Sequence, residues 1–448
     1  MLQTLREALW SFREILWGFP LIALLVVSGG YFTLRTGFFQ LHPLRLCRNT
    51  VGGLFQRKEG RWELLASVST AIGGTVGVGS ITGVAYGIAV GGAGSVFWMW
   101  VSGLTGMALK YAEVYLAVAH RKRLPDGSCT GGAPYGLTDA GFRPLGVLFA
   151  LLCVFASFGV GNLAQIGALA EATGTLGVSP PVCGLVCAGL LAFALFGGRK
   201  RIGKLNTALV PAASALYLLA LLWMLLCHLP ALPGAFGRIL REAFGLRAAF
   251  GGVTGSLLSR ALREGFARGV FSNEAGVGSS PLAHASSGES DPQKQGEWGA
   301  FEILADTFLV STLTALALLV AGGEDFRVAK LFERVFGAGG VLLFTALAAI
   351  FAFSSILSWC YYSDVCLTFL SIPHGETVYR LLSVCAAFFG AFVPLGSLWA
   401  AADILNALMI LPNLFLLFLQ RKEVVYITQK ERLSTCGILK NKKPSSAS

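Results

Sequence analysis

The chain has 448 residues, of which 54% are hydrophobic and only 13% are charged. Soluble globular domains carry roughly 25% charged residues, so most of this surface must face lipid, which excludes a cytosolic enzyme and a disordered chain. The formal net charge of +11 invites a nucleic-acid role, but the placement of the basic residues explains much of it, and no nucleic-acid partner is expected.

Apolar segments recur along the whole chain and predict an all-α polytopic membrane protein with about eleven transmembrane helices in the lipid bilayer. An odd number of crossings puts the two termini on opposite sides. The predicted spans run approximately over residues 14–34, 66–90, 92–119, 144–171, 181–198, 205–229, 262–286, 297–321, 337–370, 378–394 and 397–420.

Basic residues determine the orientation. The loops that alternate onto one side hold Arg45, Arg61, the cluster Arg121–Arg123 and the cluster Arg199–Lys204, and the basic tail lies on that side too. By the positive-inside rule this side is cytoplasmic, so the N-terminus lies outside and the C-terminus in the cytoplasm of a multi-pass inner (cell) membrane protein. Acidic residues in the flank of the first span favour a retained helix over a signal peptide.

Cysteine and histidine spacing indicates neither a metal centre nor an enzyme. The ten cysteines form no C-x-x-C pair, and several lie inside apolar spans, where a thiol behaves as a small hydrophobe. Neither a disulfide framework nor a transition-metal site is expected. Because His284 stands alone and no serine-elbow motif occurs, a membrane enzyme is the weaker alternative.

Two glycine-rich segments interrupt the apolar pattern, at Ser69–Gly83 and at Gly265–Pro281. Each internal glycine costs a helix about 1 kcal/mol relative to alanine, and non-helical backbone survives at membrane depth only where protein or a polar cavity surrounds it. We therefore predict a broken helix in each segment, with a site between them. Close packing through small residues is the alternative. It explains Gly87 and Gly91, but it gives no reason for a carboxylate at Glu274.

The two breaks divide the chain into halves. After the first span, the remaining spans form two sets of about five, each led by a broken segment, so the second set runs through the membrane in the opposite direction, as in secondary transporters with inverted repeats. The predicted units are an N-terminal helix with a basic loop (1–65), a first repeat (66–229), an external loop with an interfacial helix (230–261), a second repeat (262–420) and a basic cytoplasmic tail (421–448).

The residues around the breaks resemble one transporter family. In the first half the resemblance is carried by Ser69–Ala85, Gly91–Trp100 and Lys110–Glu113. In the second half Ala267–Pro281, followed by Ala283–Ala285, is similar to the most specific signature of the alanine or glycine:cation symporter (sodium:alanine symporter) family. The resemblance implies symport of small neutral amino acids into the cell by alternating access, through a LeuT-like 5+5 fold preceded by one extra helix. It implies Na⁺ as the coupling ion and no other cofactor.

By this resemblance the substrate lies between the breaks, where exposed N–H groups suit its carboxylate and released carbonyls suit its ammonium group and Na⁺. Phe271 and Trp359 limit the size of the pocket. A hydrogen bond between helices is the alternative role for Gln165, and capping of backbone N–H groups is the alternative for Asn273 and Glu274. The substrate-binding residues implied are Thr75, Gly77, Gly79, Gln165, Phe271, Ser272, Asn273, Gly276 and Trp359.

The implied sodium site takes its oxygens from backbone carbonyls and hydroxyls. Three of its members are serines that share one helical face, although a buried serine also bonds back to its own helix. The cation-binding residues implied are Thr75, Val78, Ser354, Ser355 and Ser358.

Two features leave the coupling ion and the substrate open. The family usually shows Thr-Gly-Asn where this chain reads Val-Gly-Ser at Val78–Ser80, which removes two polar ligands. Embedded acids such as Asp306 allow proton coupling, whereas Glu113, one turn after Lys110, favours a local ion pair. A LeuT-type carrier for nucleobases or larger amino acids, and a non-transporting sensor that kept the fold, are the further alternatives.

Overall fold

The computed structural model describes residues 2–56, 59–77, 79–244, 254–323, 325–393 and 395–424, and for 2–6, 56, 254–259 and 395–397 it describes the backbone without the side chains. Within these ranges the protein is almost entirely helical. Its β-structure there is one short antiparallel hairpin, β1 (Lys122–Arg123) paired with β2 (Cys129–Thr130). The predicted all-α class is confirmed.

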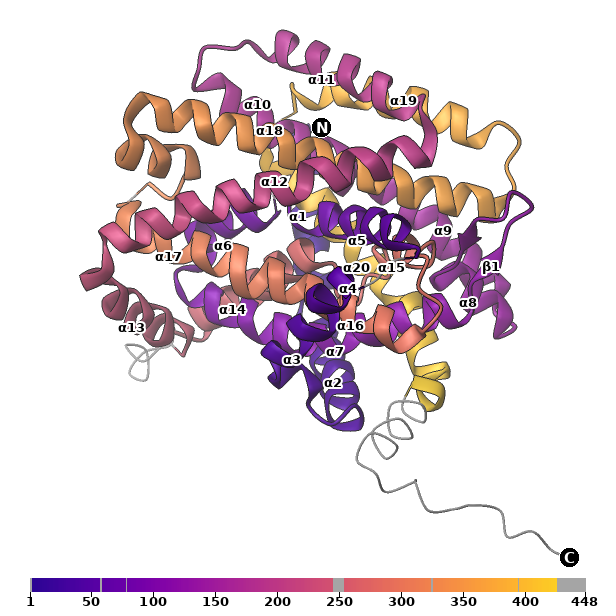
Figure 1. Cartoon of the computed structure of the whole chain (residues 1–448). Coiled ribbons are helices and arrows are strands. Elements are labelled where there is room, and N and C mark those ends of the chain that lie inside the picture. Colours follow the sequence, from indigo (N-terminus) through magenta and orange to yellow (C-terminus); the bar gives the residue numbers. More distant parts are fainter. Residues whose placement is uncertain are drawn as a thin grey trace, which may run out of the picture.

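The helices pack into one bundle (Figure 1). Those of the first half are α1 (Leu2–Leu16), α2 (Phe19–Arg35), η1 (Phe39–Leu41), α3 (Pro43–Cys47), η2 (Arg48–Gly52), α4 (Gly53–Gln56), α5 (Arg61–Thr75), η3 (Gly79–Gly83), α6 (Val84–Gly91), α7 (Gly94–Ala119), α8 (Ala133–Asp139), α9 (Arg143–Phe158), η4 (Gly159–Leu163), α10 (Ala164–Gly174), α11 (Pro180–Leu195) and α12 (Gly198–Cys227). Those of the second half are η5 (Leu229–Ala231), α13 (Leu232–Ala243), α14 (Thr254–Asn273), α15 (Pro281–His284), α16 (Pro292–Ile303), η6 (Leu304–Ser311), α17 (Thr312–Ala321), α18 (Val328–Leu370), α19 (Gly375–Gly390) and α20 (Leu395–Leu419).

Seven helices of the described chain are long and apolar enough to cross a membrane. Each matches one of the predicted spans. The other predicted spans are also helical, but α11 and α19 have only 16 residues each, and neither α7 nor the broken α14–α15 segment is among the seven. The structure therefore supports a polytopic membrane protein, while the count of eleven crossings and the LeuT-like repeat stay predictions.

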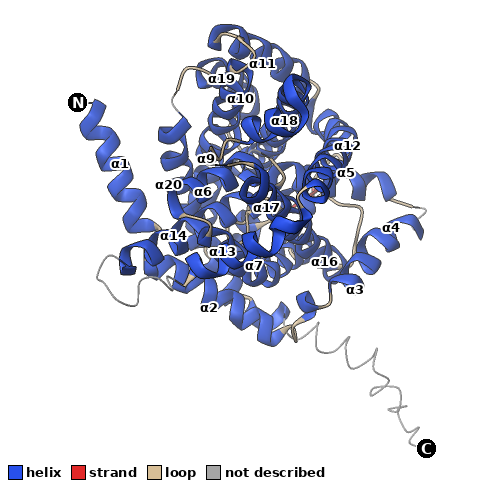
Figure 2. Cartoon of the chain, turned by 90° about the vertical axis from the view of Figure 1, so that its left-hand side faces the viewer, coloured by secondary structure: helices blue, strands red, loops and turns tan. Residues whose placement is uncertain are grey.

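The first predicted span is divided into two helices. α1 and α2 meet at Trp17 and Gly18, where Gly18 is extended and Pro20 occupies the first turn of α2, a position that suits proline because its missing N–H has no helical partner there. α1 packs against α20 and lies along one side of the bundle (Figure 2). The extra N-terminal helix thus contacts the last helix of the fold.

Both predicted helix breaks are confirmed. α5 ends at Thr75, and Val76 leaves helical geometry with ψ of 89°. α14 ends at Asn273, and the chain then passes through positive φ angles at Glu274, Gly276 and Gly278 before α15 begins. The short α15 packs against α5, and the two lie together near the centre of Figure 1.

Three π-helical segments surround the breaks. η3 follows the first break directly, η4 lies between α9 and α10, and η6 lies between α16 and α17. π segments are rare and occur frequently at functional sites, because the extra residue releases backbone groups from their usual partners. They mark the centre of the bundle as the place to look for a site.

The loop predicted to carry an interfacial helix contains α13, whose Ala235, Ile239 and Ala243 are buried. α13 packs against α7 and α17, and the side-chain Oε2 of Glu242 accepts a hydrogen bond from the backbone N of Ala93 at 2.6 Å. Residues 245–253 of this loop, and residues 425–448 of the predicted tail, lie outside the described chain.

Candidate functional site

The first break brings three predicted residues together. A Cβ atom added at Gly77 would collide with the hydroxyl of Ser355 and would lie 3.5 Å from the Oε1 of Gln165. Ser355 also donates a hydrogen bond of 2.8 Å to the carbonyl of Gly73. α5, α10 and α18 therefore meet here, and only glycine fits at position 77.

The second break meets the first at Gly79. A Cβ there would lie 2.8 Å from the ring of Phe271 and 3.2 Å from the Cα of Ser272, so the last turn of α14 closes directly on η3. Phe271 and Ser272 are both buried, as is Gln165. These contacts place six of the predicted substrate and cation residues, namely Gly77, Gly79, Gln165, Phe271, Ser272 and Ser355, in one continuous buried region.

An acidic side chain lies beside this contact. Ser272 donates to both carboxylate oxygens of Asp306, each at 2.8 Å, and its Oγ lies 2.9 Å from that of Ser80. Ser80 also contacts Asp306 directly and reaches the carbonyl of Thr75 at 3.2 Å. Thr307 completes the group with a 3.0 Å hydrogen bond to Asp306.

Other predicted residues lie around this region with partners of their own. Trp359 packs on Gly161 of η4, Ser354 bonds back to its own helix, and Ser358 accepts from the amide of Asn206 at 3.0 Å. The hydroxyl of Thr75 also bonds within its helix. Val78 lies outside the described residues.

The second break is shaped by its own side chains. Asn273 accepts a hydrogen bond of 2.9 Å from the backbone N of Ala275 and donates to Thr307, which is the capping role considered for this residue. The carbonyl of Gly276 accepts from the amide of Asn413 at 2.9 Å. Asn273 thus contacts Ala275 and Thr307, and Gly276 contacts Asn413. Their role in substrate binding stays a prediction.

A buried amine holds the same break. Lys110 of α7 donates to the carbonyl of Glu274 at 2.9 Å and to the hydroxyl of Ser280 at 2.8 Å. The pair that the sequence favours, Lys110 with Glu113, is present at 3.9 Å, the long end of an ion pair. The main partners of Lys110 are therefore groups of the broken helix.

Further carboxylates extend this network. Glu302 of α16 accepts from Ser280 at 3.0 Å and lies 2.7 Å from the Nε2 of His284. Glu113 accepts from Asn413 at 2.5 Å. All of these side chains are buried, so the second break is fixed by paired charges and charge-assisted hydrogen bonds.

A second buried charge network lies on the other side of Phe271. Arg13 of α1 contacts Asp403 of α20 at 2.6 Å and Glu264 of α14 at 2.8 Å, and Arg268 also pairs with Asp403. The guanidinium of Arg268 lies 4.7 Å from the ring centroid of Trp399. α1, α14 and α20 are thereby tied together by two arginines and two carboxylates.

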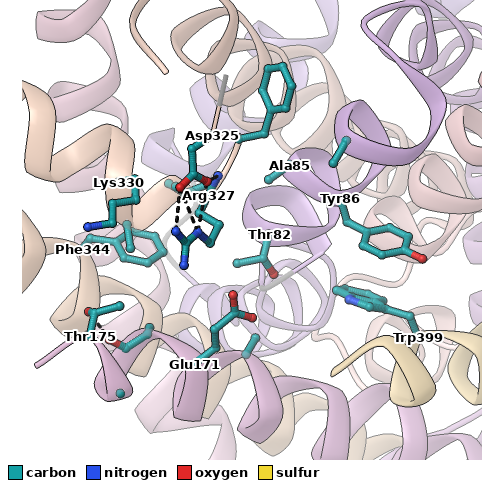
Figure 3. Close-up of a pocket in the computed structure, with 17 residues that line it drawn as sticks. Thr82, Ala85, Tyr86, Glu171, Thr175, Asp325, Arg327, Lys330, Phe344 and Trp399 are labelled. Atoms are coloured by element: carbon teal, nitrogen blue, oxygen red, sulfur yellow. Dashed lines mark hydrogen bonds and ion pairs between the residues drawn. The ribbon is translucent and has the colours of Figure 1, made fainter. Parts of the chain in front are cut away.

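A cavity of about 790 Å³ opens beyond these aromatic rings (Figure 3). Tyr86 and Trp399 line it, and the ring of Trp399 packs on Phe271 with centroids 4.6 Å apart. At its rim Arg327 forms a 2.6 Å ion pair with Asp325, and this bonding lowers the pKa of Asp325 to about 2. None of the predicted site residues lines the cavity. The cavity adjoins the buried region through the ring of Trp399, which packs on Phe271.

The described residues contain no group of three or more His, Cys, Asp or Glu side chains suited to a metal. The oxygen set around Asp306 is of a different kind, because it combines one carboxylate with neutral hydroxyls. Sequence reasoning noted Asp306 only as an embedded acid, and it missed Lys110, Arg13 and Arg268 as partners of the breaks. The available signal was the rarity of charge in apolar spans.

Comparison with known proteins gives one consistent result. The model of the sodium:alanine symporter family matches residues 2–434. The sodium/alanine symporter AgcS of Methanococcus maripaludis is 37% identical over 435 residues, covering 93% of this chain and 95% of that protein. An uncharacterized transporter of Haemophilus influenzae is 36% identical over 440 residues, covering 95% and 96%.

More distant matches differ in the substrates that their names give. The probable sodium/glutamine symporter GlnT of Bacillus subtilis is 32% identical over 443 residues, covering 96% of this chain and 91% of that protein. Among solved structures, a manganese transporter of Eremococcus coleocola aligns with a TM-score of 0.48 at 16% identity, covering 77% of this chain and 75% of that one. That likeness is too loose to define how the helices are arranged.

Proposed function

This chain belongs to the sodium:alanine symporter family, which is a family of transporters and not of enzymes, and on that premise we propose that it carries a small neutral amino acid into the cell together with Na⁺. The proposal fits the multi-pass membrane character of the chain. It assigns the substrate to the buried region between the two breaks, and it takes alanine and glycine as the substrates.

One observation carries the choice of a small substrate. At Gly77 and Gly79 a single Cβ would already collide with Ser355, Phe271 or Ser272. Trp359 is pressed against Gly161 in the same way. Interiors this densely packed resist added methylene groups at a cost of about 1–3 kcal/mol. A substrate with a methyl side chain or none is therefore favoured over a bulky one.

The ends of the broken helices supply the polar contacts of the substrate. Backbone N–H groups at the start of a helix attract a carboxylate, and carbonyls at the end of a helix attract an ammonium group. η3 begins at Gly79, and α5 ends at Thr75. A zwitterion placed between them meets both kinds of group within a few residues, with Gln165 beside it.

The path of entry is the cavity above Tyr86 and Trp399. These two rings separate the cavity from Phe271, so we assign them and Phe271 as the barrier that must open for the substrate to pass. The basic and acidic side chains at the cavity rim, Arg327 and Glu171 (Figure 3), suit the two ends of a zwitterion.

The test is uptake of labelled amino acids into proteoliposomes under an imposed Na⁺ gradient. We expect alanine and glycine to accumulate and methionine to be excluded. Phe271→Ala is expected to admit methionine, whereas Phe155→Ala, at a lipid-exposed position, should leave the selectivity unchanged. Failure of any amino acid to accumulate would contradict the proposal and favour a sensor that kept the fold.

Proton coupling is the second candidate, because Glu113, Glu274 and Glu302 are buried around a single lysine and one histidine. One relative is described as a putative sodium/proton-dependent alanine carrier. Uptake measured without Na⁺ across a pH gradient separates the two. Persistence of transport there favours protons, and its loss favours Na⁺.

A further inference from the structure

We propose that the N-terminal helix α1 takes part in opening the passage between the cavity and the buried region, with Arg13 as a positioning residue. In this proposal α1 stays with α20 while α14 separates from it, and Arg13 keeps the carboxylate of Asp403 paired throughout. The inference rests on the proposed function, because it takes the rings of Tyr86, Phe271 and Trp399 as the barrier to the substrate.

Two charged side chains lie one helical turn from this barrier. Arg268 precedes Phe271 by three residues on α14, and Asp403 follows Trp399 by four residues on α20, so each charge lies on the same side of its helix as the neighbouring ring. The ring centroids of Phe271 and Trp399 are 4.6 Å apart, and Arg268 pairs with Asp403. If the two rings part, this ion pair must part with them.

Two more charges complete the group, which we call the charge quartet (Arg13, Glu264, Arg268 and Asp403). Arg13 of α1 binds Glu264 of α14 through both of its Nη atoms, at 2.8 and 2.9 Å. The Nε of Arg13 contacts Asp403 of α20 at 2.6 Å. All four side chains are buried. Two positive and two negative charges balance one another, as the low dielectric of a protein interior demands.

The quartet divides into two neutral pairs if α1 moves with α20. α14 carries both Arg268 and Glu264, whose Nε and Oε2 atoms are 3.8 Å apart, so the contribution of this helix is neutral. α20 contributes only Asp403, and a buried carboxylate without a partner is costly. Arg13 removes that cost by staying with Asp403. If α1 stayed with α14 instead, the separation would leave a net charge on both sides.

The atoms of the quartet that lack a hydrogen bond fit this exchange of partners. Within the described chain these are Nε and Nη1 of Arg268 and Oδ1 of Asp403, all buried. When Arg13 leaves Glu264, the donors of Arg268 can bind that carboxylate on their own helix, at the i, i+4 spacing that favours such a pair. Oδ1 of Asp403 can accept the N–H groups that Arg13 has released. Each ion pair lost in the separation therefore has a replacement.

The packing of α1 favours movement with α20. α1 packs against α20 at one side of the bundle (Figure 2), and Trp17, just beyond its end, donates a hydrogen bond of 2.9 Å to the carbonyl of Asp403. Toward α14, Glu14 meets Arg263 at 3.5 Å with both side chains partly exposed, and such surface pairs contribute little. The break between α1 and α2 at Gly18 lets α1 tilt without carrying α2 along.

The experiment is Na⁺-driven uptake of alanine into proteoliposomes, with the rate expressed per folded molecule. Arg13→Met leaves Asp403 unpaired once α14 has separated, and Asp403→Asn leaves Arg13 unpaired. Each is expected to slow uptake about 100-fold, because an unpaired buried charge is costly. The double variant, Arg13→Met with Asp403→Asn, leaves no charge unpaired. We expect its uptake to be about tenfold or more above that of either single variant, because the two changes compensate each other.

Arg263→Met is the matched control, because Arg263 also joins α14 to α1 but is partly exposed. It should take up alanine as the unaltered protein does. If Arg13 acted only on stability, the rate per folded molecule would not change in Arg13→Met. That result, or a double variant as slow as the single variants, would overturn the proposal.

A second measurement follows α1 itself and keeps the test decisive if Arg13→Met does not fold. Spin labels on genetically encoded residues at the exposed positions Ile15, Arg260 and Leu411 report the distances from α1 to α14 and from α1 to α20 in the full-length protein. We expect the distance from Ile15 to Arg260 to change when Na⁺ and alanine are added, while the distance from Ile15 to Leu411 stays constant. A change from Ile15 to Leu411, or no change in either distance, would contradict the proposal.

The two proposals fail in distinguishable ways. If the unaltered protein accumulates alanine with Na⁺ but the labels show α1 moving away from α20, the transport function stands and the role given to α1 is wrong. If the labels move as expected but no amino acid accumulates, the movement of α1 with α20 stands and the transport function fails.

Discussion

At the first break the backbone is held by neutral side chains, whereas at the second it is held by a buried amine and a carboxamide. At the first break Ser355 donates a hydrogen bond to the carbonyl of Gly73, and Ser80 donates one to that of Thr75. At the second break Lys110 donates to the carbonyl of Glu274, and Asn413 donates to that of Gly276. Both sets of partners are buried, so the contrast is one of charge and not of exposure.

The difference indicates which break responds to ligands. A buried charge that loses its partner costs about 3–5 kcal/mol, so the second break is strongly held in one shape. Neutral hydrogen bonds contribute only about 0.5–1.5 kcal/mol each, so a hydroxyl at the first break exchanges easily between protein and ligand. We infer that the second break is the fixed wall and the first break is the responsive one.

The largest expected effect is on stability at the second break. Lys110→Met strands the carbonyl of Glu274 and the neighbouring carboxylates, and should lower the free energy of unfolding by about 3–5 kcal/mol. Thermal unfolding in detergent measures it. Lys122→Met is the control, because Lys122 forms a half-exposed surface pair with Asp139 that contributes less than about 1 kcal/mol. Equal unfolding temperatures for the two variants would show that the charge of Lys110 does not stabilise the second break.

At the first break we expect function to suffer more than stability. Gly77→Ala places a methyl group on the hydroxyl of Ser355 and should reduce alanine uptake about 100-fold or more, while overpacking costs only about 1–3 kcal/mol of stability. Adding Ser355→Ala removes the nearest atom and should recover stability. Wild-type uptake by Gly77→Ala would show that this wall is not part of the site.

A smaller effect is expected at the carboxamide of the second break. Asn413→Ala removes its hydrogen bonds to Gly276 and Glu113 and should cost about 1–3 kcal/mol of stability, with the Na⁺ concentration for half-maximal uptake unchanged. Asn406→Ala is the matched control on the same helix, since both polar atoms of Asn406 are buried without a hydrogen-bond partner in the described chain. A larger loss of stability for Asn406→Ala than for Asn413→Ala would contradict the role given to Asn413 at the second break.

The smallest effect concerns the departure of this chain from its family at 78–80. Restoring the family's polar residues adds a hydroxyl with Val78→Thr and replaces the hydroxyl of Ser80 with an amide in Ser80→Asn. We expect the Na⁺ concentration for half-maximal uptake to fall about threefold, or roughly 0.7 kcal/mol. If the variant and the unaltered protein have the same sodium activation curve, residues 78 and 80 do not determine the cation affinity.

Much of the fold could be predicted because local patterns report local structure. Glycine runs indicated both breaks, and the structure interrupts the helices at Val76 and Glu274. The family signature pointed to Phe271 and Ser272, which do meet Gly79. It also pointed to Asn273 and Gly276, which contact Thr307 and Asn413, and their role in substrate binding stays a prediction.

The sequence by itself determined three things: that the chain is a membrane protein, at which residues its helices break, and which family it resembles. Composition, glycine content and motifs could show this because they are properties of neighbouring residues. Only the tertiary structure decided which charges are compensated. Arg13 reaches the carboxylate of Asp403 from 390 positions away in the sequence, and Lys110 reaches the backbone carbonyl of Glu274 from 164. Asp306 instead faces hydroxyls of η3 and α14. Which side chain meets which charge depends on how the helices pack, and spacing along the chain carries no record of that.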